Sequence, residues 1–483
     1  MSLQAKIVKN ITWTSLSALI NSGGQLLILI YLVRLIAVED FALMALVQFT
    51  GALSFPLLDA LIGYSLLQSK QVSKPTFSAL WVLSLGMACC FALVFWCLAP
   101  VAAWFYHSAQ LDLYIQWGIL ALVAWGIGMP FRFFLQKTHA FRKIAIAQIL
   151  GFLVYASFSV FLAIHEYGIW ALLIAYLVRI GIENLLYLAQ AWPQQSIALW
   201  QMNWSSLRLI QKGKYFAVER IVDVFSSQID TLLIGKLLGM QALGIYDLAK
   251  RFLYRPANIL SDTIEAVLLP VFLELKNLTQ QKLLFQSMLN AICSIIMPLY
   301  CFLFISADLV SQYIYGDQAA VIAPIFAYLT IVIVLRSPRL PLDTLALGLK
   351  ASKTWLFWKL LNIPIFVLSI VLGSTYDLEG LVIALIGLQF IQLVAAYFFL
   401  IRPLIGLSFF GFQKIVTRPL LLSIALTSLF FFLKTPINGS LFYFSLSLLF
   451  GAVFYLGISY YTNPSFLQLL STFLQRLKHK IQI

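Results

Sequence analysis

Charged residues are scarce in this sequence of 483 residues, because Asp, Glu, Lys and Arg together make up only 10% of it. A soluble protein carries about 25% charged residues, which cover its water-exposed surface. A soluble domain of this length is therefore excluded. The formal net charge is nevertheless +14. Basic loops follow from topology alone in a membrane protein, and no basic and aromatic stripe stands outside the apolar runs. We therefore expect no nucleic acid as a partner.

Cysteine and histidine are also rare. All five cysteines lie in apolar runs without metal-ligand neighbours, and the four histidines are scattered through loops and the tail. This pattern excludes a disulfide framework and a zinc site. The sequence also lacks an HExxH motif, a phosphate-binding glycine-rich loop and a nucleophile elbow. We therefore expect no metal, no cofactor and no catalytic residues, and we do not expect an enzyme.

Long apolar runs are what the sequence has instead. It is 62% hydrophobic, its mean hydropathy is +0.93, and typical runs are Ala18–Leu32 and Leu378–Leu400. A helix needs roughly 20 apolar residues to cross a membrane, whereas a barrel would show short alternating segments. The fold class predicted is an all-α polytopic membrane protein. The basic N-terminal stretch leads straight into the first run, so we expect no cleaved signal peptide.

We predict fourteen membrane spans, separated by breaks that contain charged residues, Gly, Pro or Asn. The spans cover residues 12–34, 41–67, 77–104, 113–134, 143–164, 168–191, 208–235, 243–272, 284–306, 321–347, 355–374, 379–401, 418–433 and 441–461. With the N-terminus inside, the inner segments hold 21 Lys and Arg residues. The outer segments hold Arg34, Lys236 and Lys434, and are otherwise acidic. This bias predicts that both termini lie in the cytoplasm.

The domain boundaries follow from the longest inner connection and from a repeat. Residues 192–207, WPQQSIALWQMNWSSL, are polar and rich in Trp, which suits a cytoplasmic connector in the membrane interface. We predict an N-lobe at 1–191, a C-lobe at 208–401, and two further spans with a basic cytoplasmic tail at 402–483. The segment VRLIAVEDFALMALV (33–47) aligns with GKLLGMQALGIYDLA (235–249), which indicates a parallel repeat of six spans. A chance match of two apolar hairpins is the alternative.

Charged residues inside the spans are the candidate functional residues, because a charge at mid-bilayer costs about 2.5–3.5 kcal/mol on insertion scales. They are Asp59 in span two; Arg179 and Glu183 in span six; Arg220, Asp223 and Asp230 in span seven; Lys250, Arg251, Arg255, Asp262 and Glu265 in span eight; and Arg336, Arg339 and Asp343 in span ten.

Some of these charges have an intrahelical partner and others do not. We interpret Arg179–Glu183 as an ion pair that fixes helix packing, and Arg339–Asp343 has the same spacing. For Arg220–Asp223, an ion pair and a substrate role stay equally open. Asp59 has no charged neighbour in its own span.

Arginines without a nearby acid are suited to phosphate, whose oxygens they grip bidentately. The first acid that follows Arg251 and Arg255 along the chain is Asp262, seven residues after Arg255. A pyrophosphate would suit Arg251, Arg255, Arg336 and Arg339 if spans eight and ten face each other. The RSPRLP sequence in span ten places two prolines among two arginines, which should break that helix.

The segments QIDTLLIGKLLGMQALGIYDLAKRFLYRPANIL, LLPVFLEL and ALGLK resemble the polysaccharide-export flippases of bacteria, as does the first repeat segment. These are the O-antigen and colanic-acid members of the multidrug/oligosaccharidyl-lipid/polysaccharide exporter superfamily. The resemblance implies two six-helix lobes, two accessory helices, and transport of an undecaprenyl-pyrophosphate-linked oligosaccharide to the outer leaflet. It implies membrane lipids, and polymerase or chain-length proteins of the same pathway, as partners.

The resemblance also implies cavity cations, for which the candidates are Arg220, Arg251, Arg255, Arg336 and Arg339. An ion gradient is the expected energy source, with Asp59, Asp223 and Asp230 as candidates for ion coupling. A multidrug extruder of the same superfamily is the main alternative, but its cationic substrates favour an acidic cavity. A membrane polymerase or ligase would need a large outer loop, whereas the longest one expected here has about 14 residues. A peptidoglycan-precursor flippase stays open.

Overall fold

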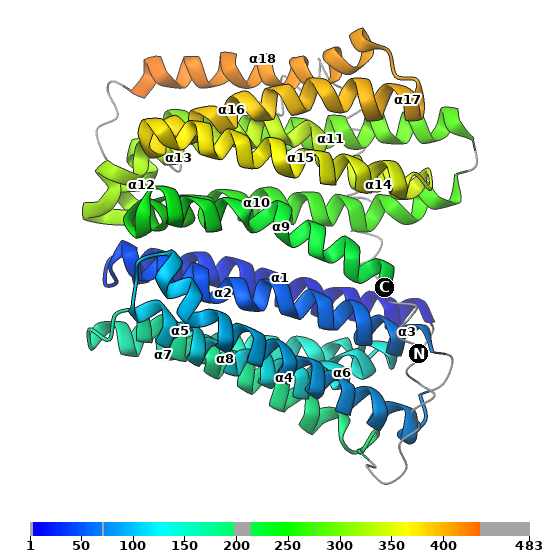
Figure 1. Ribbon diagram of the computed structural model, residues 1–483. Helices are drawn as coiled ribbons and strands as arrows, with labels where there is room; N and C mark the ends of the chain where they lie inside the picture. Colours follow the sequence, from blue (N-terminus) through cyan, green and yellow to red (C-terminus); the bar gives the residue numbers. More distant parts are fainter. Residues whose placement is uncertain (1–2, 70–71, 198–213, 276, 435–483) are drawn as a thin grey trace. The chain divides into compact units, whose positions relative to one another are not determined.

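The computed structural model describes residues 3–69, 72–197, 214–275 and 277–434, and every regular element within them is a helix. Figure 1 shows long helices running side by side. The polytopic all-α class is confirmed, because ten helical segments of the described chain are long and apolar enough to cross a membrane. Long helices are the expected result of apolar runs, since a helix satisfies its own backbone groups in lipid.

The chain divides into two compact units, which we call unit 1 (residues 1–247) and unit 2 (residues 248–483). Unit 1 contains α1 (Leu3–Leu32), α2 (Val38–Leu58), the π-helix η1 (Asp59–Gly63), α3 (Tyr64–Gln68), α4 (Lys74–Phe105), α5 (Gln110–Gly118), α6 (Leu120–Lys137), α7 (Phe141–Ile164), α8 (Ile169–Ala191), α9 (Lys214–Leu237) and the start of α10 (Gly239–Glu274). Within it, α8 packs against α6 and α7, α1 packs on α7, and α2 contacts α5 and α9.

Unit 2 contains the rest of α10 and then α11 (Leu278–Ile305), α12 (Ala307–Tyr315), the 3₁₀ turn η4 (Gly316–Gln318), α13 (Ala319–Arg336), the 3₁₀ turn η5 (Ser337–Arg339), α14 (Leu342–Gly348), α15 (Ser352–Gly373), the 3₁₀ turn η6 (Ser374–Tyr376), α16 (Asp377–Ala396), the π-helix η7 (Tyr397–Ile401), α17 (Arg402–Ile405) and α18 (Phe409–Lys434). Within it, α13 packs against α11, α12 and α16, and α11 contacts α18.

Twelve of the fourteen predicted spans fall on described helices or helical runs. Span seven, 208–235, does so from residue 214 onward, and the fourteenth, 441–461, lies outside the described residues. The outer segment expected between spans nine and ten folds as the short helix α12. The fourteen-helix layout in two lobes stays a prediction, as do the domain boundaries. The predicted connector at 192–207 lies outside the described residues from residue 198 onward.

The predicted tight turn between spans seven and eight is present between α9 and α10. Gly239 has φ of 86° there, a conformation that favours glycine. Gly244, one turn into α10, allows close packing in unit 1: a Cβ at this position would lie 2.2 Å from the carbonyl oxygen of Val38. Small residues at helix contacts let backbones approach closely in membrane proteins, which explains why this turn is rich in them.

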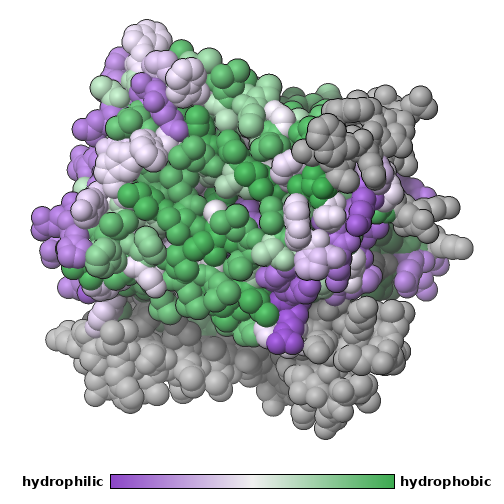
Figure 2. Space-filling view, turned by 90° about the horizontal axis from the view of Figure 1, so that it is seen from below, coloured by the Kyte–Doolittle hydropathy of each residue, from purple (hydrophilic) through white to green (hydrophobic). Residues whose placement is uncertain are grey.

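The surface matches a chain surrounded by lipid. Figure 2 shows one face that is broadly hydrophobic at its centre, with hydrophilic residues gathered toward opposite edges. On α4, the side chains of Leu93, Trp96 and Trp104 are 60%, 52% and 75% exposed. An apolar patch of this extent on a soluble monomer would be exceptional, whereas a bilayer requires one.

Candidate functional site

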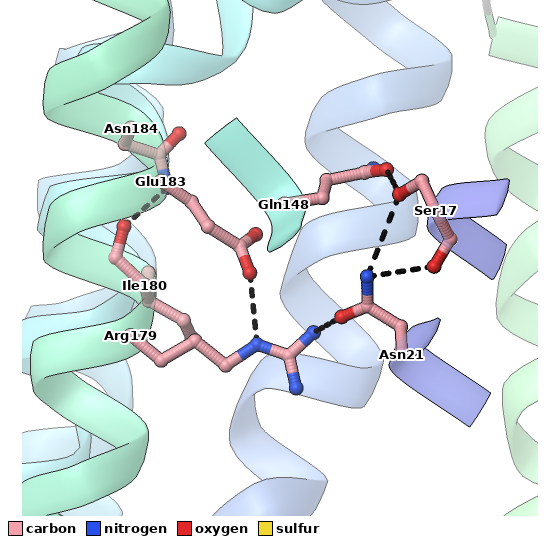
Figure 3. Close-up of polar contacts among 7 residues, drawn as sticks. All are labelled: Ser17, Asn21, Gln148, Arg179, Ile180, Glu183 and Asn184. Atoms are coloured by element: carbon pink, nitrogen blue, oxygen red, sulfur yellow. Dashed lines mark hydrogen bonds and ion pairs between the residues drawn. The ribbon is translucent and has the colours of Figure 1, made fainter. Parts of the chain in front are cut away.

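A partly buried polar network in unit 1 surrounds the predicted pair Arg179 and Glu183 (Figure 3). The Nε of Arg179 donates to Oε1 of Glu183 over 2.8 Å, which confirms the intrahelical ion pair on α8. The guanidinium also donates to Oδ1 of Asn21 on α1 over 2.9 Å. Ser17, one turn before Asn21, donates to Gln148 of α7 over 2.7 Å. The network therefore ties together three helices rather than offering open groups to a substrate.

A glycine makes room for this ion pair. A Cβ at Gly151 of α7 would lie 2.4 Å from Cγ of Glu183, which is 8% exposed. The carboxylate can therefore reach Arg179 only because position 151 has no side chain.

A second ion pair in unit 1 gives Asp59 a charged partner on another helix. Asp59 accepts from Arg132 of α6 over 2.7 Å and from the indole nitrogen of Trp125 over 3.2 Å. The Arg132 guanidinium lies 4.9 Å from the Trp125 ring centroid and 4.8 Å from that of Phe133. Sequence reasoning missed Arg132, although its place inside the predicted span 113–134, two residues after Pro130, was a usable signal.

Asp59 lies where α2 changes its hydrogen-bonding pattern. Pro56 lies inside α2 and supplies no backbone N–H, and the π-helix η1 begins at Asp59. Single π-turns of this kind are frequent at functional sites. Each side chain of the Asp59–Arg132 pair is 22% exposed.

The candidates on α9 have different surroundings from one another. Arg220 lies 3.5 Å from Asp223, but their side chains are 49% and 30% exposed, so this ion pair is weak. Asp230 is buried, and it accepts from the hydroxyl of Tyr246 and the backbone N–H of Thr231, each over 2.8 Å. Asp230 therefore anchors α9 to the first turns of α10.

The C-terminal end of α9 also makes contacts that the sequence did not indicate. The hydroxyl of Tyr106, just after α4, donates to the carbonyl of Leu232 over 3.0 Å. Lys236 donates to the carbonyl of Phe105 over 2.6 Å. Burial raises the pKa of Tyr106 to about 12, so this hydroxyl stays a donor at physiological pH.

In unit 2, the predicted break in span ten is confirmed at its arginines. Helix α13 ends at Arg336, the 3₁₀ turn η5 covers Ser337–Arg339, and α14 begins at Leu342. Pro338 and Pro341 supply no backbone N–H, which prevents a continuous α-helix here. Broken helices at membrane depth are tolerated where they are buried in protein or line a water-filled cavity, and they build binding sites in many transporters.

The described partners of Arg336 and Arg339 are neutral. Arg339 donates to Oε1 of Gln392 over 2.6 Å and also to Oε1 of Gln389, both on α16. The Arg336 guanidinium lies 5.1 Å from the ring centroid of Tyr254 on α10. Spans eight and ten therefore meet at this point, which is the condition that the sequence interpretation set for a shared anion site.

The alternative of an Arg339–Asp343 ion pair, which the spacing left open, is not what the structure shows. Asp343 instead lies 3.1 Å from Nζ of Lys359 and accepts from the indole of Trp355 over 2.5 Å. Spacing of four residues brings side chains together only on a continuous α-helix, and η5 interrupts the helix between these two residues.

The remaining candidate cations lie on α10 near Tyr254. Nζ of Lys250 lies 5.9 Å from the Tyr254 ring centroid, and Arg251 and Arg255 are half-buried within one turn of it. The side chain of Asp262, which the sequence interpretation related to them, lies outside the described part of the structure. No group of three metal-ligating residues occurs among the described residues.

These features define a class: a multi-pass helical membrane protein with cations on a broken helix, as expected of a transporter for an anionic substrate. A family model described as "Polysaccharide biosynthesis protein" matches residues 31–324. The match covers more than half of the chain, so the chain belongs to this family of polysaccharide biosynthesis proteins.

A curated relative and two solved structures agree with this family and fold. The "Lipopolysaccharide biosynthesis protein WzxC" of Escherichia coli is 23% identical over 431 residues, which cover 88% of this chain and 87% of the relative. The lipid II flippase MurJ in an inward closed conformation has a TM-score of 0.71 at 13% identity, over 94% of this chain and 98% of that one. An inward-facing multidrug-resistance MATE transporter has a TM-score of 0.56 at 13% identity, over 85% and 98%.

Proposed function

We propose that this protein is a flippase that moves an oligosaccharide linked to undecaprenyl pyrophosphate across the bacterial inner membrane. The observation that carries the proposal is the pair Arg336 and Arg339 on an interrupted helix, with neutral partners in the described chain. Guanidinium groups grip phosphate oxygens bidentately, and an anionic ligand would supply the missing counter-charge. The relation to a lipopolysaccharide biosynthesis protein and the fold shared with a lipid II flippase support this substrate class.

The depth of Arg336 and Arg339 in the membrane is suited to binding the head group of a lipid. Helix α13 has 18 residues from Ala319, so it is about 27 Å long and nearly crosses a hydrocarbon core of about 30 Å. Arg336 ends this helix, and the turn at Gly316–Gln318 begins it. In the predicted orientation that turn is outside, so the arginines lie near the cytoplasmic head groups. They would receive the diphosphate there while its polyprenyl tail stays in lipid.

The finer features are part of the same proposal. Arg220, Arg251 and Arg255 would add positive potential along the path, and alternating access would carry the head group outward. The proposed protein has two six-helix lobes with two accessory helices, and both of its termini lie in the cytoplasm. Its proposed partners are polymerase or chain-length proteins.

Of the three carboxylates proposed for ion coupling, Asp59 fits best. It lies at a π-turn and has one strong cationic partner, Arg132, which protonation of the carboxylate would release. Asp230 is held by Tyr246 and Thr231 in a structural role, and Asp223 lies in a weak, half-exposed pair.

The multidrug-extruder alternative rests on the fold shared with a MATE transporter. That fold is also shared with a lipid flippase, so fold alone does not discriminate. Arg336 and Arg339, whose partners among the described residues are neutral, favour an anionic substrate over a cationic drug.

Genetic complementation tests the proposal. In a strain that lacks the gene, Arg336→Gln and Arg339→Gln should restore less than a tenth of the wild-type surface polysaccharide. The lipid-linked intermediate should accumulate in the cytoplasmic leaflet. Arg402→Gln, an exposed position on α17, is the matched control and should restore export. Asp59→Asn should weaken the dependence of export on the ion gradient.

The outcome that would overturn the proposal is equally concrete. Surface polysaccharide would be normal in the deletion strain itself, while its sensitivity to cationic drugs rises. The drug-extruder function would then take its place.

A further inference from the structure

Two glutamines of α16 hold the guanidinium of Arg339. Gln389 and Gln392 are three residues apart, on one face of the helix. Their residues are only 6% and 7% exposed, and each directs its amide oxygen at a terminal nitrogen of Arg339. The guanidinium is thereby fixed from one side by two acceptors that carry no charge.

This arrangement is unusual for a buried arginine. Burying a charge is costly unless it is paired and hydrogen-bonded, so a carboxylate is the expected partner. The acid nearest to Arg339 in sequence, Asp343, forms an ion pair with Lys359. Arg336, which is also a cation, lies close enough to Arg339 to repel its positive charge. Among the described residues, the buried Nε of Arg339 has no hydrogen-bond acceptor either.

The amide nitrogens of the two glutamines extend the donor set. Because the oxygens accept from Arg339, the NH₂ groups must point elsewhere, and they have no partner within the described part of the chain. A site with two guanidinium groups, one over the ring of Tyr254 and one held by neutral amides, is therefore rich in donors, and the described residues supply no counter-ion to Arg339.

We propose that Gln389 and Gln392 are positioning residues that orient Arg339 without neutralising it, so that the diphosphate of the substrate becomes its counter-ion. The inference rests on the proposed function and deepens it. A glutamate at either position has nearly the same shape, but its carboxylate forms an ion pair with Arg339 and neutralises the charge of the guanidinium. The internal carboxylate then competes with the diphosphate.

The decisive variants are Gln389→Glu and Gln392→Glu. We expect both to fold and to keep or raise the Tm in detergent, because each gives a buried cation a partner. Export in the complementation assay should fall to less than a tenth of wild type. Affinity of the purified protein for undecaprenyl pyrophosphate, measured by native mass spectrometry, should fall about tenfold or more. Gln413→Glu, at an exposed position on α18, adds the same charge elsewhere and should leave both readouts unchanged.

The outcomes separate this inference from the function on which it rests. If Arg339→Gln abolishes export while both glutamate variants fold and export normally, the positioning role is overturned and the flippase function stands. If both glutamate variants fail to fold, the glutamines are structural and the inference also fails. If Arg336→Gln and Arg339→Gln both export normally, the arginine site itself is refuted.

Discussion

At the residue scale, the charges inside the predicted spans have two kinds of surroundings. In unit 1, Arg179 pairs with Glu183 and Asp59 pairs with Arg132, so each pair is neutral overall. In unit 2, the hydrogen-bond acceptors of Arg339 among the described residues are the amide oxygens of Gln389 and Gln392. Neutral pairs fix helix packing at little electrostatic cost, whereas an unneutralised arginine is expensive to bury and is expected at functional sites.

The limits of sequence reasoning are visible in the same residues. Arg179–Glu183 could be predicted because both members lie on one helix, where spacing gives proximity. Asp59–Arg132 joins two helices, and nothing in the local sequence records which helices are neighbours. The Gln389 and Gln392 contacts were unpredictable for the same reason, and because glutamine in an apolar helix carries no charge signal.

Gly151 gives the sharpest prediction at this scale. Gly151→Ala places a methyl group against Cγ of Glu183, which displaces the carboxylate from Arg179. Overpacking typically costs about 1–3 kcal/mol, so the Tm in detergent should fall by several degrees. Gly181→Ala on α8 is the control, because nothing lies within 4 Å of its added Cβ. That change should be neutral or slightly stabilising, as Ala favours a helix. Equal effects of the two changes would show that Glu183 does not need the space at Gly151.

At the scale of elements, interruptions of helices mark the charged sites. The π-helix η1 starts at Asp59, and the 3₁₀ turn η5 ends at Arg339. The break at η5 could be predicted from the RSPRLP sequence, since two prolines remove two backbone donors. The π-helix could not, because Pro56 is compatible with a simple kink as well.

The break in span ten should be necessary for transport. Changing both Pro338 and Pro341 to Ala restores two backbone donors, and each change favours a continuous helix by about 3 kcal/mol in a helix interior. Joining α13 to α14 would rotate Arg339 away from Gln389 and Gln392. We expect folded protein at normal membrane levels but less than a tenth of wild-type export. Pro364→Ala, inside the uninterrupted helix α15, is the control. Normal export by the double variant would show that the arginines do not depend on the break.

At the scale of the whole molecule, the cations that gather in the predicted inner segments have a second role. Three lysines on the predicted inner side donate to carbonyl oxygens at the ends of helices: Lys137 to Leu66, Lys143 to Gln190 and Lys282 to Gly406. Cations at helix C-termini satisfy orphan carbonyls and the helix dipole. The lysines that orient the chain therefore also cap α3, α8 and α17, each within its own unit. The count of Lys and Arg residues in alternate segments predicted on which side of the membrane these lysines lie. Their carbonyl partners could be identified only from the fold.

The orientation itself is the last prediction, and it fixes which leaflet the arginines meet. In a functional variant without the five native cysteines, single cysteines at Ser108 and Asp317 should react with a membrane-impermeant maleimide in intact cells, because both turns follow outward-running helices. Cysteines at Ser73 and Thr138 should react only after the membrane is permeabilised. The four positions lie in four different connections between spans. A span wrongly assigned between any two of them would reverse the labelling expected at the later position. The reverse pattern would place Arg336 and Arg339 at the outer leaflet, where they would act in release of the diphosphate rather than in its capture.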